Sequence, residues 1–125
     1  MIPYVAYKLV HLFGIFLLVA SLGGAAIHAA NGGTREASLT RRLVGIGHGV
    51  ALFLILLGGF GMLARLSASG SMALPGWIWG KLIIWVVLGG LMLLPYRRPQ
   101  YARGVFVAVP TLGLLAAILA LTKPF

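Results

Sequence analysis

The sequence predicts an all-α, polytopic membrane protein built as a bundle of four transmembrane helices. Of its 125 residues, 61% are hydrophobic and 9% are charged, whereas about a quarter of the residues in a typical soluble domain are charged. The apolar residues fall into four segments, each close to the roughly 20 residues that span a bilayer. These segments lack a period-two alternation, and lipid tolerates only helices or closed barrels, so helices are expected.

The four predicted helices share this apolar character and cover residues 4–28, 43–66, 75–94 and 105–121. A polar loop at 31–42 joins the first two, and a Gly/Ser-rich loop at 67–73 joins the second to the third. A Pro/Arg-rich link at 95–103 leads into the fourth helix, where we expect Pro110 to introduce a kink. Because these connections are short, residues 1–125 are predicted to form a single membrane domain.

The charge is strongly positive, with ten Lys or Arg residues against one acidic residue, Glu36. The positive residues are spread between apolar runs rather than gathered in one polar patch, which argues against nucleic-acid binding. Six belong to the first and third loops: Arg35, Arg41, Arg42, Arg97, Arg98 and Arg103. Four belong to the opposite side: Lys8, Arg65, Lys81 and Lys123. The positive-inside rule therefore predicts cytoplasmic first and third loops and periplasmic termini.

The inventory of reactive side chains excludes several kinds of chemistry. The chain has no Cys, which excludes disulfide scaffolds, thiolate metal sites and Cys nucleophiles. One carboxylate excludes catalysis by a carboxylate pair and carboxylate metal cages. A small multidrug-type transporter also has four helices, but it needs a carboxylate within the membrane. Glu36 lies in the polar loop, which argues against that class.

The glycines predict close contact between helices. Gly45 and Gly49 form a small-xxx-small pair, and such residues let helix backbones approach in lipid. Further glycines form similar clusters at Gly23, Gly24, Gly58, Gly59, Gly61, Gly89 and Gly90. They account for plain helix packing, and they also leave room for a flat cofactor.

Ionisable groups within a membrane are costly and are functional candidates by default. His11 and Lys81 enter from the side of the termini and lie about 10 Å and about 9 Å deep, so they share a level. His48 lies in the other half of the bilayer, and roughly 10 Å separates it in depth from His11. One upright haem is therefore not expected to take both histidines as ligands. His28 is closer to His48 in depth, at the interface.

Each of these residues also has a simpler interpretation. His11 is also explained by a hydrogen bond between helices, which the residues by themselves favour over a ligand. Lys81 follows Trp77 and Trp79, an aromatic belt beside which a lysine extends to the headgroups. His48 stands among glycines that suit helix packing as well as a buried ligand, and the loop arginines suit headgroup contacts.

Four motifs resemble those of one family, in the same order along the chain: KLVHLFGIF (8–16), TRRLVGI (40–46), PGWIWGKLIIWVVLGG (75–90) and VPTLGLLAAILALTKPF (109–125). They resemble the HemJ-type protoporphyrinogen IX oxidases, small bacterial proteins with four transmembrane helices. In that family a His of the first helix and a Lys of the third are tied to activity and to binding of haem b. They correspond to His11 and Lys81.

The resemblance implies a haem-b protein of the bacterial cytoplasmic membrane that oxidises protoporphyrinogen IX to protoporphyrin IX in haem and chlorophyll biosynthesis. His11 is then the ligand of the haem iron, and Lys81 is a second ligand or the partner of a propionate. Both are the candidate catalytic residues. His48 is a further candidate for cofactor binding, and a quinone or another membrane acceptor takes the electrons.

The chain departs from the family pattern in two places. The stretch SLGGAAI (21–27) replaces an aromatic, Pro- and Arg-containing run, which leaves His28 as the counterpart of the family's next His. Val107 and Ala108 stand where the family commonly has Asn-Glu. Since oxidation also removes protons, these losses favour an alternative. In it, the chain is a non-catalytic subunit of a larger respiratory or photosynthetic membrane complex, or a homo-oligomer.

Overall fold

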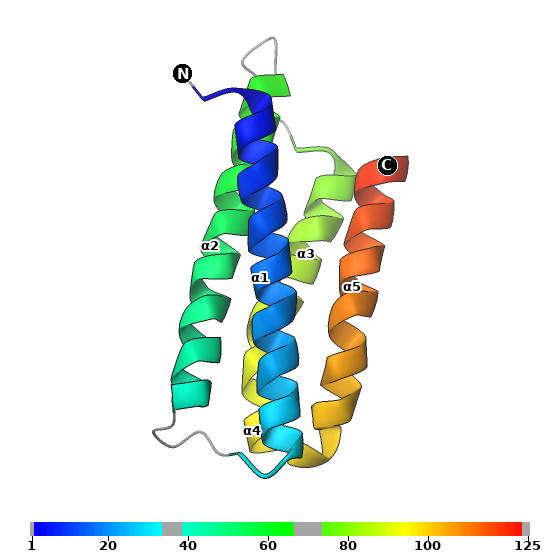
Figure 1. The fold of residues 1–125 in the computed structure, drawn as a ribbon. Helices are drawn as coiled ribbons and strands as arrows, with labels where there is room; N and C mark the ends of the chain where they lie inside the picture. The colour runs from blue at the N-terminus through cyan, green and yellow to red at the C-terminus, as the bar shows by residue number, and fades with distance from the viewer. Residues whose placement is uncertain (1, 34–38, 67–73, 124–125) are drawn as a thin grey trace.

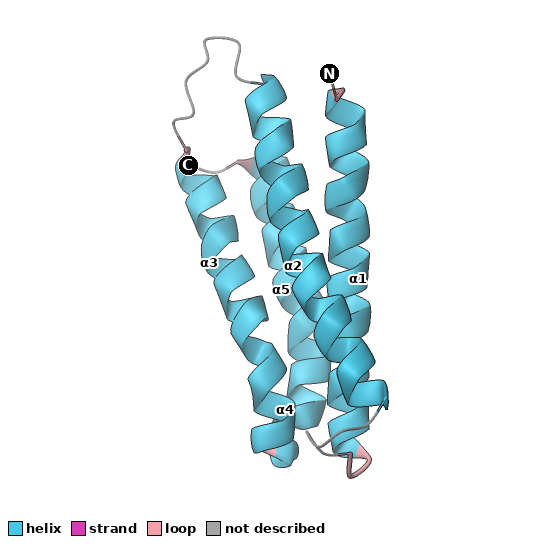
Figure 2. Ribbon diagram, turned by 90° about the vertical axis from the view of Figure 1, so that its left-hand side faces the viewer, coloured by secondary structure: helices cyan, strands magenta, loops and turns pink. Residues whose placement is uncertain are grey.

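The computed structural model describes residues 2–33, 39–66 and 74–123. Its four long helices are α1 (Tyr4–Ala30), α2 (Leu39–Leu66), α3 (Gly76–Gly90) and α5 (Ala102–Thr122). A short helix, α4 (Leu94–Arg97), lies between two 3₁₀ turns, η1 (Leu91–Leu93) and η2 (Pro99–Tyr101). No strand occurs in these three described ranges, and Figure 2 shows helices joined by loops. The predicted all-α four-helix bundle is confirmed.

Four helical stretches are long and apolar enough to cross a membrane: Tyr4–Ala30, Leu39–Leu66, Gly76–Arg97 and Pro99–Thr122. They run alternately up and down, so both termini lie at one end of the bundle (Figure 1). The opposite end holds α4, the end of α1 and the start of α2. We call it the α4 end, and the other the terminal end.

Helices α1 and α2 form the closest pair in the bundle, and glycines on both helices make the approach possible. A Cβ atom on Gly14 would lie 3.0 Å from the backbone nitrogen of Ile55. A Cβ atom on Gly24 would lie 3.1 Å from the Val44 side chain. Because the helices are antiparallel, later residues of α1 meet earlier residues of α2.

The prediction that small residues draw helices together is met at Gly14, Gly24 and Gly58. It is wrong for the predicted pair Gly45 and Gly49. A Cβ atom on Gly49 would have nothing within 4 Å, and one on Gly45 would meet the Arg41 side chain of its own helix.

The apolar core lies toward the α4 end. Its buried side chains come from the second half of α1, the first half of α2, the end of the third span and the start of α5: Leu18, Leu22, Ala25, Ala26, Val44, Ala51, Leu88, Met92, Val105 and Val109. Leu22 and Val109 are among the largest fully buried side chains. The half of the bundle at the terminal end has fewer buried residues, and His11 is one of them.

The third span changes its helical form, and proline provides the reason. Proline has no amide proton, so Pro95 cannot donate to the carbonyl of Leu91 four residues earlier. The backbone tightens into η1 instead, and the Leu94 amide bonds to the Leu91 carbonyl. The sequence predicted a helix to residue 94 followed by a link. The structure breaks the α-helix at Gly90 and continues helically to Arg97.

Two smaller differences concern α2 and α5. Helix α2 begins at Leu39, before the predicted start at residue 43, because its first turn extends beyond the apolar segment. Helix α5 begins at Ala102, before the predicted start at residue 105, and contains Pro110 in its interior. Next to that proline, the Thr111 hydroxyl donates to the Val107 carbonyl at 2.9 Å.

Candidate functional site

His11 is buried where α1 crosses α2, with 8% of its surface exposed. Its Nδ1 lies 2.8 Å from the backbone carbonyl oxygen of Ile55 on α2. Two glycines of α2 make room for it. A Cβ atom on Gly58 would lie 2.6 Å from the backbone nitrogen of His11, and one on Gly59 would lie 3.4 Å from its ring. The imidazole therefore occupies space that larger side chains would fill.

This hydrogen bond fixes the chemistry of the ring. A carbonyl oxygen only accepts, so Nδ1 of His11 carries the proton and donates it to Ile55. Nε2 of the neutral ring then carries a lone pair. Histidines that bind metals commonly donate their other ring N–H to a carbonyl or carboxylate, which orients the ring. His11 therefore has the protonation and support of a metal ligand.

Lys81 lies on α3 and is half-buried. Its Nζ is 5.9 Å from the centre of the Trp77 ring, within the range of a cation–π contact. Lys81 is also within electrostatic range of His11.

His48 lies on α2 with 7% of its surface exposed. Its Nε2 donates to the backbone carbonyl of Gly89, at 3.1 Å. That carbonyl lies next to the point where α3 ends, at Gly90, and η1 begins. Nδ1 of His48 is buried and has no hydrogen-bond partner among the described residues.

His11 and His48 lie at different depths. His11 packs against Gly58, ten residues along α2 from His48. At 1.5 Å per residue this is about 15 Å along the helix. The two rings are therefore too far apart to bind one iron from both sides, in agreement with the sequence.

His28 has a partner of its own. A hydrogen bond of 2.8 Å joins its Nδ1 to the hydroxyl of Tyr96 on α4, and the two rings meet edge to face. His28 and His48 thus contact different parts of the third span. Within the described ranges, no group of three or more His, Cys, Asp or Glu side chains is placed to hold a metal ion.

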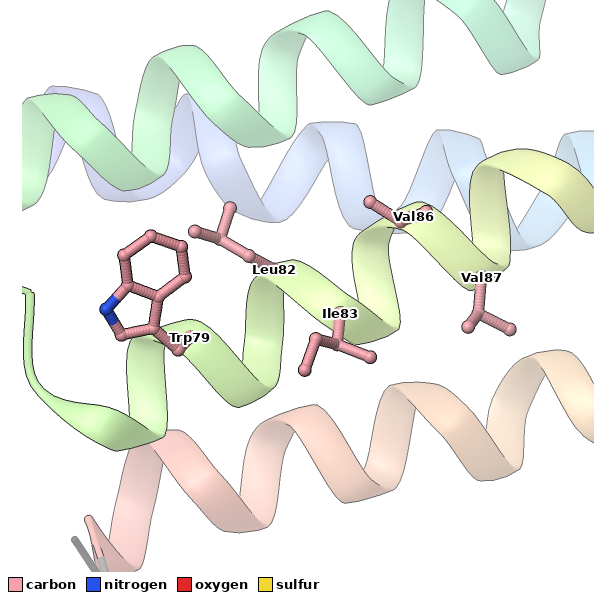
Figure 3. Close-up of a pocket in the computed structure, with 5 residues that line it drawn as sticks. All are labelled: Trp79, Leu82, Ile83, Val86 and Val87. Atoms are coloured by element: carbon pink, nitrogen blue, oxygen red, sulfur yellow. The ribbon is translucent and has the colours of Figure 1, made fainter.

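An apolar groove of about 300 Å³ lies apart from these residues, on the outward face of α3. Its lining consists of Trp79, Leu82, Ile83, Val86 and Val87, all projecting from that helix (Figure 3). The groove includes neither His11 nor Lys81. In a bilayer such a face is covered by lipid or by another apolar surface.

The sequence missed the groups that hold the histidines in place. Two of them are backbone carbonyls, those of Ile55 and Gly89, which leave no mark on the side-chain pattern. The third is the hydroxyl of Tyr96. A further bond between helices joins the Trp85 indole to the Leu52 carbonyl at 3.2 Å. The paired Gly58 and Gly59 were a usable signal, because they mark where another element approaches.

Haem can be tested against these donors. A haem iron takes an imidazole nitrogen as an axial ligand, and the hydrogen bond from Nδ1 of His11 to the Ile55 carbonyl leaves Nε2 as the nitrogen that could bind it. A haem also carries two carboxylates, and Lys81 supplies an ammonium group within electrostatic range of His11. The donor set at His11 and Lys81 therefore fits the group.

Comparison with protein-family models, with curated proteins and with solved structures finds no match to this chain. An assignment of function therefore depends on the chemistry of the residues and on the motifs they form.

Proposed function

We propose that this chain is a HemJ-like integral membrane protein that binds haem b at His11 and oxidises protoporphyrinogen IX to protoporphyrin IX. One observation carries the proposal: Nδ1 of His11 donates to the Ile55 carbonyl, which leaves Nε2 of a buried ring available as a ligand. The expected location is the bacterial cytoplasmic membrane, with the termini on the periplasmic side.

In this proposal the haem supplies the electron transfer when it is bound. His11 holds and orients it, and the backbone bond to Ile55 keeps the imidazole from rotating. Lys81 provides a positive charge that attracts a carboxylate of the tetrapyrrole. His48 is a second candidate for cofactor binding, because its buried Nδ1 lacks a partner among the described residues. A quinone or another membrane acceptor receives the electrons.

The first prediction concerns haem retention by His11→Gln. Glutamine can still donate an N–H to the Ile55 carbonyl but offers no imidazole nitrogen to iron. We therefore expect the haem affinity of the purified variant to fall at least tenfold. Loss of a group that only hydrogen-bonds to a metal ligand already lowers metal affinity roughly 10- to 100-fold. Absorption spectra of oxidised and dithionite-reduced protein measure the loss.

His28→Gln is the matched control, because His28 bonds to the Tyr96 hydroxyl rather than to Ile55. It is expected to keep a full Soret band. A full Soret band in purified His11→Gln, or wild-type protein without any b-type spectrum, overturns the haem assignment. Circular dichroism of each variant verifies that the helices are retained.

A second candidate is a non-catalytic subunit of a larger membrane complex. Its support is that each histidine has a hydrogen bond to another helix, which accounts for its burial without a cofactor. Growth of a haem-auxotrophic strain that lacks its own oxidase, after expression of this chain, rejects the purely structural role. Stable co-migration with a large complex on native gels, together with unchanged spectra in His11→Gln, favours it.

A further inference from the structure

The basic residues are divided by type between the two ends of the bundle. Apart from Arg65, in the last turn of α2, the described arginines lie around the α4 end, at the start of α2, in and just after α4, and at the start of α5: Arg41, Arg42, Arg97, Arg98 and Arg103. The three lysines lie toward the terminal end: Lys8 on α1, Lys81 on α3 and Lys123 directly after α5. If positive charge were the one property selected, arginine and lysine would be found at both ends. The preference for arginine at the α4 end therefore indicates a role for the guanidinium group itself.

Four of these arginines have exposed side chains in the structure: Arg42, Arg97, Arg98 and Arg103. We call this set the arginine end. Arg97 ends α4, Arg98 precedes η2, Arg103 lies in the first turn of α5, and Arg42 lies in the first turn of α2. The described residues include no acidic side chain, because Glu36, the one acid of the sequence, falls outside them.

The backbone that carries Arg97 and Arg98 is held in place. Pro95 is fully buried at the start of α4. The hydroxyl of Tyr96 is hydrogen-bonded to His28 of α1, and the Arg41 guanidinium of α2 lies 6.0 Å from the centre of the Tyr96 ring. Helix α4 is therefore joined to two neighbouring helices, and the charged surface is formed before any ligand arrives.

The position of these arginines identifies the anion. Arg97 is the last residue of the third span, and Pro99 is the first residue of the fourth, so the arginine end lies at the level of the lipid headgroups. Guanidinium groups bind phosphate oxygens through two parallel hydrogen bonds, a geometry that an ammonium group cannot match. Anionic leaflets attract such groups most strongly when several lie close to the surface.

We propose that the arginine end is a binding site for the phosphate headgroup of an anionic phospholipid. This site is separate from the proposed haem site, and neither proposal depends on the other. Bound lipid would neutralise the charge at the α4 end and hold that end of the bundle at the headgroups of one leaflet.

The second prediction tests this site with full-length protein in nanodiscs of equal parts phosphatidylglycerol and phosphatidylcholine. Native mass spectrometry counts the lipids of each kind that remain bound. The wild-type chain should retain phosphatidylglycerol preferentially. Arg97→Gln/Arg98→Gln should weaken this retention by about 25-fold, since each cationic side chain near an anionic surface contributes roughly fivefold.

The control is Lys8→Gln/Lys123→Gln, which also removes two exposed positive charges, but at the terminal end. It should retain phosphatidylglycerol as the wild type does. Three results overturn the proposal: no preference by the wild type, equal losses in both double variants, or displacement of the lipid by excess inorganic phosphate. The last result would indicate a site for free anions. Unchanged circular dichroism confirms that each variant is folded.

Discussion

Helices α1 and α3 are both apolar enough to cross a membrane, yet they are packed to very different extents. Within the most apolar window of each span, 39% of α1 is buried inside the bundle, against 6% of the span that contains α3. Helix α1 meets α2 through glycines and carries the buried His11. Helix α3 presents large apolar side chains outward, among them Trp79 and Ile83.

The difference shows that apolar content does not decide which helices pack in a membrane. Lipid tails are as apolar as leucine, so burying a leucine against another helix gains little. Close approach of backbones and hydrogen bonds between helices supply the attraction instead. The pair α1–α2 has both. Gly58 lets the backbone of α1 approach closely, and the Ile55 carbonyl accepts a hydrogen bond from His11.

Gly58→Ala should have the largest effect on the packing of α1 against α2. The new Cβ atom would lie 2.6 Å from the backbone nitrogen of His11, which cannot move without shifting α1. We expect the free energy of unfolding to fall by about 3 kcal/mol or more, at the upper end of overpacking effects. Unfolding in mixed detergent micelles, followed by circular dichroism, measures the change.

Gly49→Ala is the control on the same helix, since nothing lies within 4 Å of its added Cβ atom. It should be neutral, or more stable by up to about 1 kcal/mol, because alanine is the better helix former. Equal destabilisation by both substitutions would show that helix propensity, not the contact with α1, governs the result.

His48→Phe should have an intermediate effect, and it tests how α3 is joined to α2. The variant keeps an aromatic ring but loses the donor to the Gly89 carbonyl. We expect a loss of about 1 kcal/mol, within the range measured for hydrogen bonds between membrane helices. The same detergent titration detects it. Unchanged stability would mean that the Gly89 carbonyl needs no donor from α2.

Ile83→Ala should have the smallest effect, under about 0.5 kcal/mol. This side chain is 65% exposed on the outward face of α3, where lipid or detergent replaces the lost contacts. Its neighbour Ile84 packs against the core, so Ile84→Ala should cost about 1 kcal/mol or more. A larger loss for Ile83 in detergent-solubilised monomer would show that this face has a protein partner within the bundle.

The sequence predicted the four helices well but not the form of the third span. Its apolar run continues across Gly90, so composition alone indicates one helix to residue 94. The break at Leu91–Leu93 depends on the backbone hydrogen bonds around Pro95 and on the donor from His48. Such local rearrangements are settled by backbone geometry, which hydropathy does not record.

For the candidate site, the sequence indicated candidate residues but not what they contact. The depth estimate placed His11 and Lys81 together, because depth depends only on position along a straight helix. It did not indicate the Ile55 carbonyl, because every residue has a carbonyl and its availability depends on the register of α1 against α2. Whether His11 binds haem stays a prediction that the spectra decide.

By itself, the sequence determined that this chain has four segments long and apolar enough to cross a membrane, that its histidines and Lys81 lie within these segments or at their edges, and that most of its arginines lie in the first and third connections between them. These properties follow from the cost of placing charge and unpaired backbone groups in lipid, which acts on each segment separately. The tertiary structure decided that α1 pairs with α2, that His11 donates to Ile55, and that α3 faces outward. Those outcomes depend on contacts of backbone and side chain between segments, which the order of residues in any one segment does not specify.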